Sequence, residues 1–178
     1  GIEVRIARYH NVYGPHGCWH GGREKAPAAF CRKVAVAHNN TEIEMWGDGK
    51  QTRSFCYIDD CIEGTIRLML SKYQKPINIG SSELISMNDM HKLICSFENK
   101  NILVKHVAGP QGVRGRCSDN TMLKQVLEWE PCISLKDGLY MLYMWIKDEL
   151  QDKQHVDGFT RSHIVIQDSK VLDDLKFF

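Results

Sequence analysis

The sequence predicts an α/β fold, in which strands and helices alternate along the chain. Three observations favour this class. Residues 2–9 alternate apolar and polar positions through a β-branched stretch, which is typical of a strand. Residues 59–71 place apolar side chains at helical spacing on one face. Residues 76–80 form a short apolar run that ends in glycine, as expected of a buried strand followed by a turn.

Each further element follows from a local pattern. Strands are expected where β-branched and aromatic residues stand between turn signals. The expected strands are residues 2–9, 42–46, 54–58, 76–80 and 102–107. Helices are expected where apolar residues recur every three or four positions. The expected helices are residues 27–40, 59–71, 87–99, 120–127 and 135–153.

Several helix starts carry capping signals. Pro27 is tolerated in a first helical turn, where its missing N–H is no loss. Asp59 can cap the next helix. Ser-x-x-Asp boxes at 86–89 and 134–137 can cap two later helices. The Gly-Asp-Gly run at 47–49 predicts a turn after the second strand.

Composition excludes several classes of function. The formal net charge of +1 gives no bulk attraction to nucleic acid or to an anionic membrane. No apolar run approaches the length of a membrane span. The seven cysteines are odd in number and never spaced C-x-x-C, so reduced thiols in a cytoplasmic protein are expected rather than disulfides or a zinc site.

Two long connections stand out as candidate binding loops. Residues 10–27 contain four glycines and the charged triplet Arg23-Glu24-Lys25, and they follow a strand. Open α/β proteins bind ligands in loops at strand ends. Residues 109–118 form a second loop that carries both glycine and arginine.

Several motifs together resemble the extended short-chain dehydrogenase/reductase superfamily of sugar-nucleotide enzymes. They are N-x-Y-G-P at 11–15, G-D-G-x-x-x-R-x-F-x-Y-I-x-D at 47–60, and N-I-G at 78–80. The loops at 21–33 and 109–116 resemble, within it, the GDP-mannose 3,5-epimerase family. The resemblance covers roughly residues 1–153.

The resemblance implies the C-terminal portion of a Rossmann-type fold, without the N-terminal half that binds the dinucleotide. Residues 1–153 would combine the edge of the Rossmann sheet with the nucleotide-sugar-binding domain, and 154–178 would be a divergent tail. NAD would bind mainly upstream of this chain. The family is typically a homodimer, which makes a homodimer the expected assembly here.

The resemblance also implies a chemistry. NAD oxidises C4 of GDP-mannose, which acidifies the protons on C3 and C5. Their removal and return on the opposite face leads to GDP-L-galactose or GDP-L-gulose. Inversion needs a proton donor and an acceptor on opposite faces of the ring. In the family these are a lysine, which matches Lys25, and a cysteine that lies upstream.

The same resemblance implies binding roles. Substrate contacts would come from Asn11, Glu24, Lys25, Ala26, Lys33, Gln51, Arg53 and Arg116. Tyr9 and His10 would approach the nicotinamide. The residues alone leave simpler interpretations open. Asn11 is equally suited to a turn, Lys25 to an exposed loop, and Lys33 to a solvated helix face.

Two patterns imitate a cofactor site. Glycines at 109, 112 and 115 have a dinucleotide-binding spacing, but no acidic residue ends a second strand about 20 residues later. Tyr143-x-x-x-Lys147 imitates a catalytic pair, but core packing with a solvated lysine is the preferred interpretation. The chain by itself is therefore expected to be inactive. Two alternatives stay open: a non-catalytic sugar-nucleotide-binding or partner-binding module, and another nucleotide-sugar epimerase or dehydratase.

Overall fold

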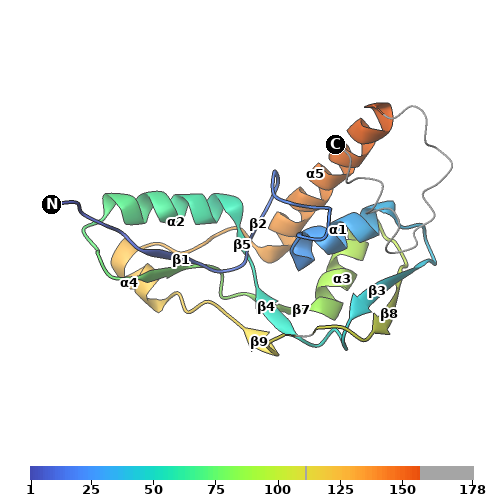
Figure 1. The fold of residues 1–178 in the computed structure, drawn as a ribbon, viewed down its shortest axis with the longest axis horizontal. Coiled ribbons are helices and arrows are strands. Elements are labelled where there is room, and N and C mark those ends of the chain that lie inside the picture. Colours follow the sequence, from blue (N-terminus) through green and yellow to red (C-terminus); the bar gives the residue numbers. More distant parts are fainter. Residues whose placement is uncertain (111, 157–178) are drawn as a thin grey trace.

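A computed structural model describes residues 1–110 and 112–156. Its strands are β1 (Ala7–Tyr9), β2 (Val12–Tyr13), β3 (Glu42–Trp46), β4 (Thr52–Ser54), β5 (Cys56–Tyr57), β6 (Ile77–Ile79), β7 (Leu84–Ser86), β8 (Leu103–Val107) and β9 (Gly115–Arg116). Its helices are α1 (Ala26–Val36), α2 (Ile58–Leu70), α3 (Met87–Ser96), α4 (Thr121–Leu127) and α5 (Leu135–Val156). Figure 1 shows two groups of elements joined by short central strands.

The first group contains β1, β6, α2 and α4, on the left of Figure 1. β1 and β6 pair in parallel, with Tyr9 opposite Ile79. Parallel neighbours need a crossover connection, and α2 supplies it before β6 begins. Buried side chains of Leu68, Ile77 and Leu123 contribute to the small core beneath the helices.

The second group packs α1, α3 and α5 against one another, on the right of Figure 1. Its core contains Val34, Ile94, Leu139 and Tyr143, each with no exposed surface. β3 and β8 form a parallel pair beside these helices. Between the groups, β2 pairs with β5, and β4 lies between β7 and β9. These central strands connect the first candidate loop to the second.

The capping signals are largely confirmed. Ser86 accepts a hydrogen bond from the N–H of Asp89 at 3.0 Å, and Ser134 accepts one from the N–H of Asp137 at 3.1 Å. Pro27 lies in the first turn of α1. The prediction for Asp59 was wrong in detail, because α2 begins at Ile58 and Asp59 lies in its first turn. A carboxylate there still favours the helix through its dipole.

Strand boundaries needed more correction than helix boundaries. The strand expected at 2–9 is assigned only over Ala7–Tyr9, because its pairing with β6 begins at the Ile6 carbonyl, which accepts from the Ile77 N–H. The strand expected at 54–58 is divided into β4 and β5, which pair with different neighbours. β2, β7 and β9 were not expected. They are two or three residues long, too short for a sequence period to reveal.

The amphipathic pattern of α2 was read correctly, but its apolar stripe does not face the core of the described residues. Ile62, Ile66 and Met69 are 49%, 42% and 63% exposed, and α2 instead buries its opposite side, including Cys61 and Leu68. A helix that is apolar on two sides is typical of an element covered from both. The exposed apolar residues Ile2, Val4 and Ile6 precede β1 on the same group.

The long final helix extends to Val156, beyond the predicted end at 153, so the proposed boundary between domain and tail falls inside α5. Most of the expected tail lies outside the described residues. The Tyr143-x-x-x-Lys147 pattern lies on this helix and is structural. Both side chains bind the carboxylate of Glu98, at 2.8 Å for the tyrosine hydroxyl. Lys147 is thus ion-paired rather than simply solvated.

Candidate functional site

The candidate site lies where β1 ends and the first long loop begins. The main-chain N–H of His10 donates to the Ile79 carbonyl, which continues the β1–β6 pairing by one residue. Asn11 then adopts a left-handed conformation with φ of 46°. Its side-chain amide donates to the Ser54 carbonyl at 3.0 Å, and its own carbonyl accepts from the Cys56 N–H. Asn11 therefore holds this loop against the junction of β4 and β5.

Three cationic residues come to this place from three parts of the chain. Lys25 lies just before α1, and its ammonium is 3.4 Å from the Val12 carbonyl. Arg53 on β4 and Arg116 on β9 are register partners in a parallel pair, so their side chains leave neighbouring strands side by side. Among the described residues none of the three forms an ion pair with a carboxylate.

The pKa of the His10 imidazole is affected by all three cations. Burial lowers the pKa of His10, and the positive charges of Arg116, Lys25 and Arg53 lower it further. The three cations therefore act on one ring from the two candidate loops and from β4. Three positive groups without carboxylate partners favour the binding of an anion.

Glu24, predicted to line the sugar, is engaged within its own loop. Its carboxylate accepts from Arg32 at 2.9 Å and from the Gly22 N–H at 2.7 Å. Burial opposes ionisation of Glu24, but these bonds and the backbone N–H of Glu24 outweigh it and lower its pKa. The carboxylate thus orders the loop that carries Lys25. Ala26, the residue after Lys25, is the first residue of α1.

The remaining predicted substrate residues, Lys33 and Gln51, contact main-chain carbonyls of β3. The ammonium of Lys33 donates to the Glu44 carbonyl at 2.9 Å, which ties α1 to β3. The amide nitrogen of Gln51 lies 3.4 Å from the Trp46 carbonyl, and its Oε1 atom is buried without a partner in the described residues. Trp46 itself is 60% exposed.

Tyr9 and His10 leave β1 on opposite sides, as successive strand residues do. The Tyr9 hydroxyl is 3.1 Å from the Thr65 hydroxyl on α2. Tyr9 lines a depression of about 520 Å³ together with Arg5, Thr65 and Met69. Only His10 faces the cationic cluster.

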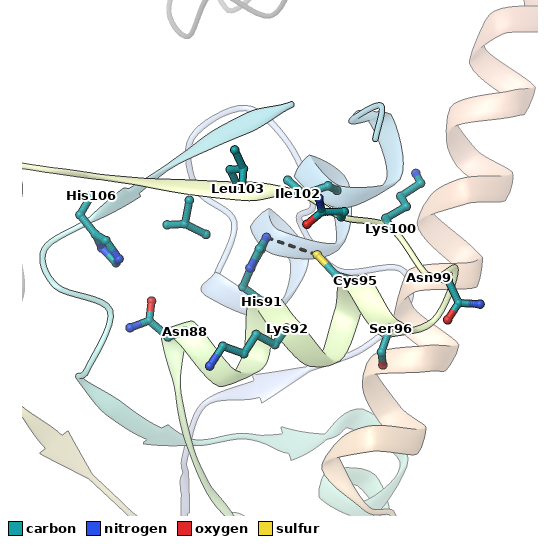
Figure 2. Close-up of a pocket in the computed structure, with 12 residues that line it drawn as sticks. Asn88, His91, Lys92, Cys95, Ser96, Asn99, Lys100, Ile102, Leu103 and His106 are labelled. Carbon is teal, nitrogen blue, oxygen red and sulfur yellow. Dashed lines mark hydrogen bonds between the residues drawn. The ribbon is translucent and has the colours of Figure 1, made fainter. Parts of the chain in front are cut away.

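A groove of about 560 Å³ lies elsewhere, between α3 and β8 (Figure 2). His91 and Cys95 face each other there, with Nε2 and Sγ 3.3 Å apart. Burial lowers the pKa of His91 and raises that of Cys95, so both groups are uncharged near neutral pH. An uncharged thiol is a poor nucleophile and a poor metal ligand.

The glycine spacing at 109–115 does not form a dinucleotide-binding turn. Glycine 109 passes over Trp46, where a Cβ would lie 2.7 Å from the indole, and β9 follows rather than a helix. Arg114 makes two hydrogen bonds to Asp48, which are the main reason that the pKa of Asp48 is lowered to about 2. Within the described residues, no group of three metal-ligating side chains is present, and no helix is both long and apolar enough to cross a membrane.

Sequence reasoning missed the residues that hold His10. The Ser54 hydroxyl is 3.3 Å from Nδ1 of His10, and the Ser118 N–H donates to that hydroxyl at 3.3 Å. Gly80 lies against both, since a Cβ there would be 2.7 Å from the Cβ atoms of His10 and Ser118. Gly80 belongs to the N-I-G motif, so the sequence marked this position. It did not indicate that the glycine leaves space for His10 and Ser118.

Comparison with known proteins agrees with the resemblance seen in the motifs. A model of the NAD dependent epimerase/dehydratase family matches residues 1–80. GDP-mannose 3,5-epimerase 1 of Oryza sativa subsp. indica is 53% identical over 169 residues, which is 93% of this chain and 44% of that protein. GDP-mannose 3,5-epimerase of Arabidopsis thaliana is 53% identical over 154 residues, which is 86% of this chain and 40% of that protein. The chain therefore spans less than half the length of these relatives.

A solved structure agrees as well. UDP-glucuronic acid 4-epimerase from Bacillus cereus, in complex with UDP-glucuronic acid and NAD, superposes with a TM-score of 0.72 at 30% identity, over 83% of this chain and 46% of that one. The shared architecture confirms the predicted portion of a Rossmann-type epimerase fold. Over residues 1–80 the chain is thus similar to the NAD dependent epimerase/dehydratase family, and over most of its length it is similar to the GDP-mannose 3,5-epimerases.

Proposed function

We propose that Lys25, Arg53 and Arg116 bind the diphosphate and sugar of a nucleotide sugar, and that this chain is the substrate-binding half of a GDP-mannose 3,5-epimerase. The observation that carries the proposal is that Arg53 and Arg116 are register partners on neighbouring strands and that, like Lys25, neither forms an ion pair with a carboxylate among the described residues. Diphosphate oxygens suit guanidinium groups, which donate two hydrogen bonds in one plane. The 53% identity to GDP-mannose 3,5-epimerases favours GDP-mannose as the ligand.

In this proposal Lys25 exchanges a proton with the sugar ring on one face. Its ammonium has a single, long hydrogen bond among the described residues, to Val12, and is free to turn toward a ligand. Inversion needs a second group on the other face, and in the family that group is a cysteine that lies upstream of the residues matched here. We therefore expect no conversion of GDP-mannose to GDP-L-galactose or GDP-L-gulose by this chain alone.

The family's cofactor, NAD, supplies transient oxidation of C4 when bound. The described residues contain no dinucleotide-binding turn, so we propose that NAD is held chiefly by residues outside the 178 of this sequence. Tyr9 and His10 would contribute at the nicotinamide side. We also propose a cytoplasmic homodimer, with residues 1–153 joining a Rossmann edge to the nucleotide-sugar domain. The exposed apolar side of α2 supports a further covering surface.

Two observations favour alternatives. Since no described residues form a dinucleotide-binding turn, a non-catalytic sugar-nucleotide-binding module is the main rival. The second rival is an enzyme of another nucleotide sugar. UDP-glucuronic acid decarboxylase 5 of Arabidopsis thaliana is 36% identical over 143 residues, 80% of this chain and 40% of that protein.

Calorimetric titration of the full chain tests these options. We expect binding of GDP-mannose that does not require NAD, and weaker binding of UDP-glucuronic acid. A preference for the UDP sugar would favour the second rival, and absence of binding to either would contradict the proposal. Incubation with NAD and GDP-mannose is the companion experiment, in which epimerised product would show that the chain is a complete catalyst.

A further inference from the structure

The short strand β9, which carries Arg116, has little pairing of its own. It consists of two exposed residues at the edge of the sheet formed by β7, β4 and β9. Its register places Arg116 opposite Arg53 on β4. So short a strand at a sheet edge is marginal by itself, because few ladder hydrogen bonds hold it. The placement of Arg116 beside Arg53 therefore depends on the chain to either side of β9.

Before β9, the chain is held by an exposed ion pair. Arg114 donates two hydrogen bonds to Asp48, at 2.9 and 2.8 Å. The two side chains are 60% and 43% exposed, and ion pairs in such positions contribute little to stability. The Thr52 N–H also donates to the Arg114 carbonyl at 3.0 Å, next to the β4–β9 pairing. This side alone therefore leaves Arg116 weakly restrained.

After β9, the chain enters a group of buried polar contacts. Ser118 is 4% exposed, and its N–H donates to the hydroxyl of the fully buried Ser54 at 3.3 Å. The Ser118 hydroxyl donates to Oδ1 of Asn120 at 2.7 Å. The side-chain amide of Asn120 donates in turn to the Gly80 carbonyl at 2.6 Å. Asn120 thus ties the end of the second candidate loop to the residue that follows β6.

The same anchor holds the first candidate loop. The Ser54 carbonyl accepts a hydrogen bond from the side-chain amide of Asn11 at 3.0 Å. Ser54 directly follows Arg53 and is the last residue of β4. The first loop, β4 and the second loop therefore meet at one buried residue. The contacts of Asn120 complete this arrangement on the side of Arg116.

We infer that Asn120 is a positioning residue that keeps Arg116 beside Arg53, so that both guanidinium groups are in place for one anionic ligand. Asn120 acts through Arg116, because the amide and the carbonyl of its own side chain are both bonded within the protein. Such preorganisation increases affinity by lowering the cost of ordering the binding groups. The inference rests on the proposed function, in which Arg53 and Arg116 bind the diphosphate.

A double-mutant cycle in the full chain, measured by calorimetric titration with GDP-mannose, tests this role. Asn120→Ala should weaken binding by about tenfold, which is part of the loss expected for Arg116→Gln. In the Arg116→Gln protein the same change should alter the affinity by less than about twofold, because Asn120 acts through Arg116. A general structural weakening would instead reduce the affinity equally in both backgrounds. Asn101→Ala removes an exposed amide contact to Asn40 and, as the matched control, should bind as the wild type does.

A second measurement needs no ligand. Amide hydrogen exchange of residues 113–118 should be faster in Asn120→Ala than in the wild type, because β9 opens more often, and should be unchanged in Asn101→Ala. Ser118→Ala removes the hydroxyl that donates to Asn120 and should change the exchange in the same direction by a smaller amount. If Asn120→Ala does not fold, Ser118→Ala takes its place in both measurements.

The outcomes separate this inference from the proposed function. Failure of the wild type to bind GDP-mannose overturns the proposed function, and the exchange measurement then decides whether Asn120 holds β9. Unchanged exchange of residues 113–118 in Asn120→Ala overturns the inference. An equal loss of affinity in the wild-type and Arg116→Gln backgrounds overturns it as well, since Asn120 would then not act through Arg116.

Discussion

The cationic cluster around His10 and the groove between α3 and β8 differ in whether their polar side chains have partners. The groove has a volume of about 560 Å³, yet its His91 and Cys95 contact each other and are uncharged near neutral pH. Lys25, Arg53 and Arg116 line neither this groove nor the depression beside Tyr9, and none of them has a carboxylate partner among the residues that the structure describes. A group of cations without carboxylate partners favours an anionic ligand, whereas the volume of a groove does not by itself indicate which ligand it binds.

The largest expected effect separates the two regions by charge. Arg116→Gln removes a guanidinium from the cluster and should weaken GDP-mannose binding by about 10- to 150-fold, the range for a hydrogen bond to a charged group. Lys92→Gln makes a similar change at the groove, where Lys92 has a 76% exposed side chain, and should leave the affinity unchanged. Calorimetry checks both variants, and equal losses would remove the distinction between the regions.

A second effect concerns the cradle of His10. Gly80→Ala introduces a Cβ that would lie 2.7 Å from the Cβ atoms of His10 and Ser118. Such overpacking should lower the free energy of unfolding by about 1–3 kcal/mol, measured by urea denaturation, and should weaken ligand binding as well. Gly17→Ala is the control, because its nearest contact is the Gly14 carbonyl at 3.4 Å. A Gly80→Ala protein as stable as the control would show that the approach is not tight.

The smallest expected effect is a pH dependence shared by both regions. Burial lowers the pKa of His91 and is the largest cause of the lowered pKa of His10. Once unfolded, each side chain takes up a proton below its ordinary pKa of 6.5, whereas the folded ring does not. The unfolded state then binds more protons, so stability is complete above pH 6.5 and falls as the pH drops below it.

Urea denaturation at pH 7.5 and pH 5.5 measures this loss. His91→Gln should reduce the loss, because one of the two buried rings is then absent. His10 should account for part of what remains. An unchanged loss in His91→Gln would show that the groove histidine is not responsible.

The sequence by itself determined the α/β class, most helices and the resemblance to the nucleotide-sugar epimerases. Helices were readable because capping boxes such as 86–89 and apolar spacing are local signals. The motifs also placed Lys25 and Arg116 in candidate loops. Short strands such as β2 and β9 were not readable, since two residues carry no period.

Only the tertiary structure decided which candidates meet. His10 and Ser54 are 44 positions apart, and Gly80 and Ser118 reach the same point from two further segments. It also placed Lys33 against β3 and Glu24 against Arg32, contacts that no spacing predicts. The physical reason is that a hydrogen bond or an electrostatic field depends on distance in space, whereas local sequence patterns record only neighbours along the chain.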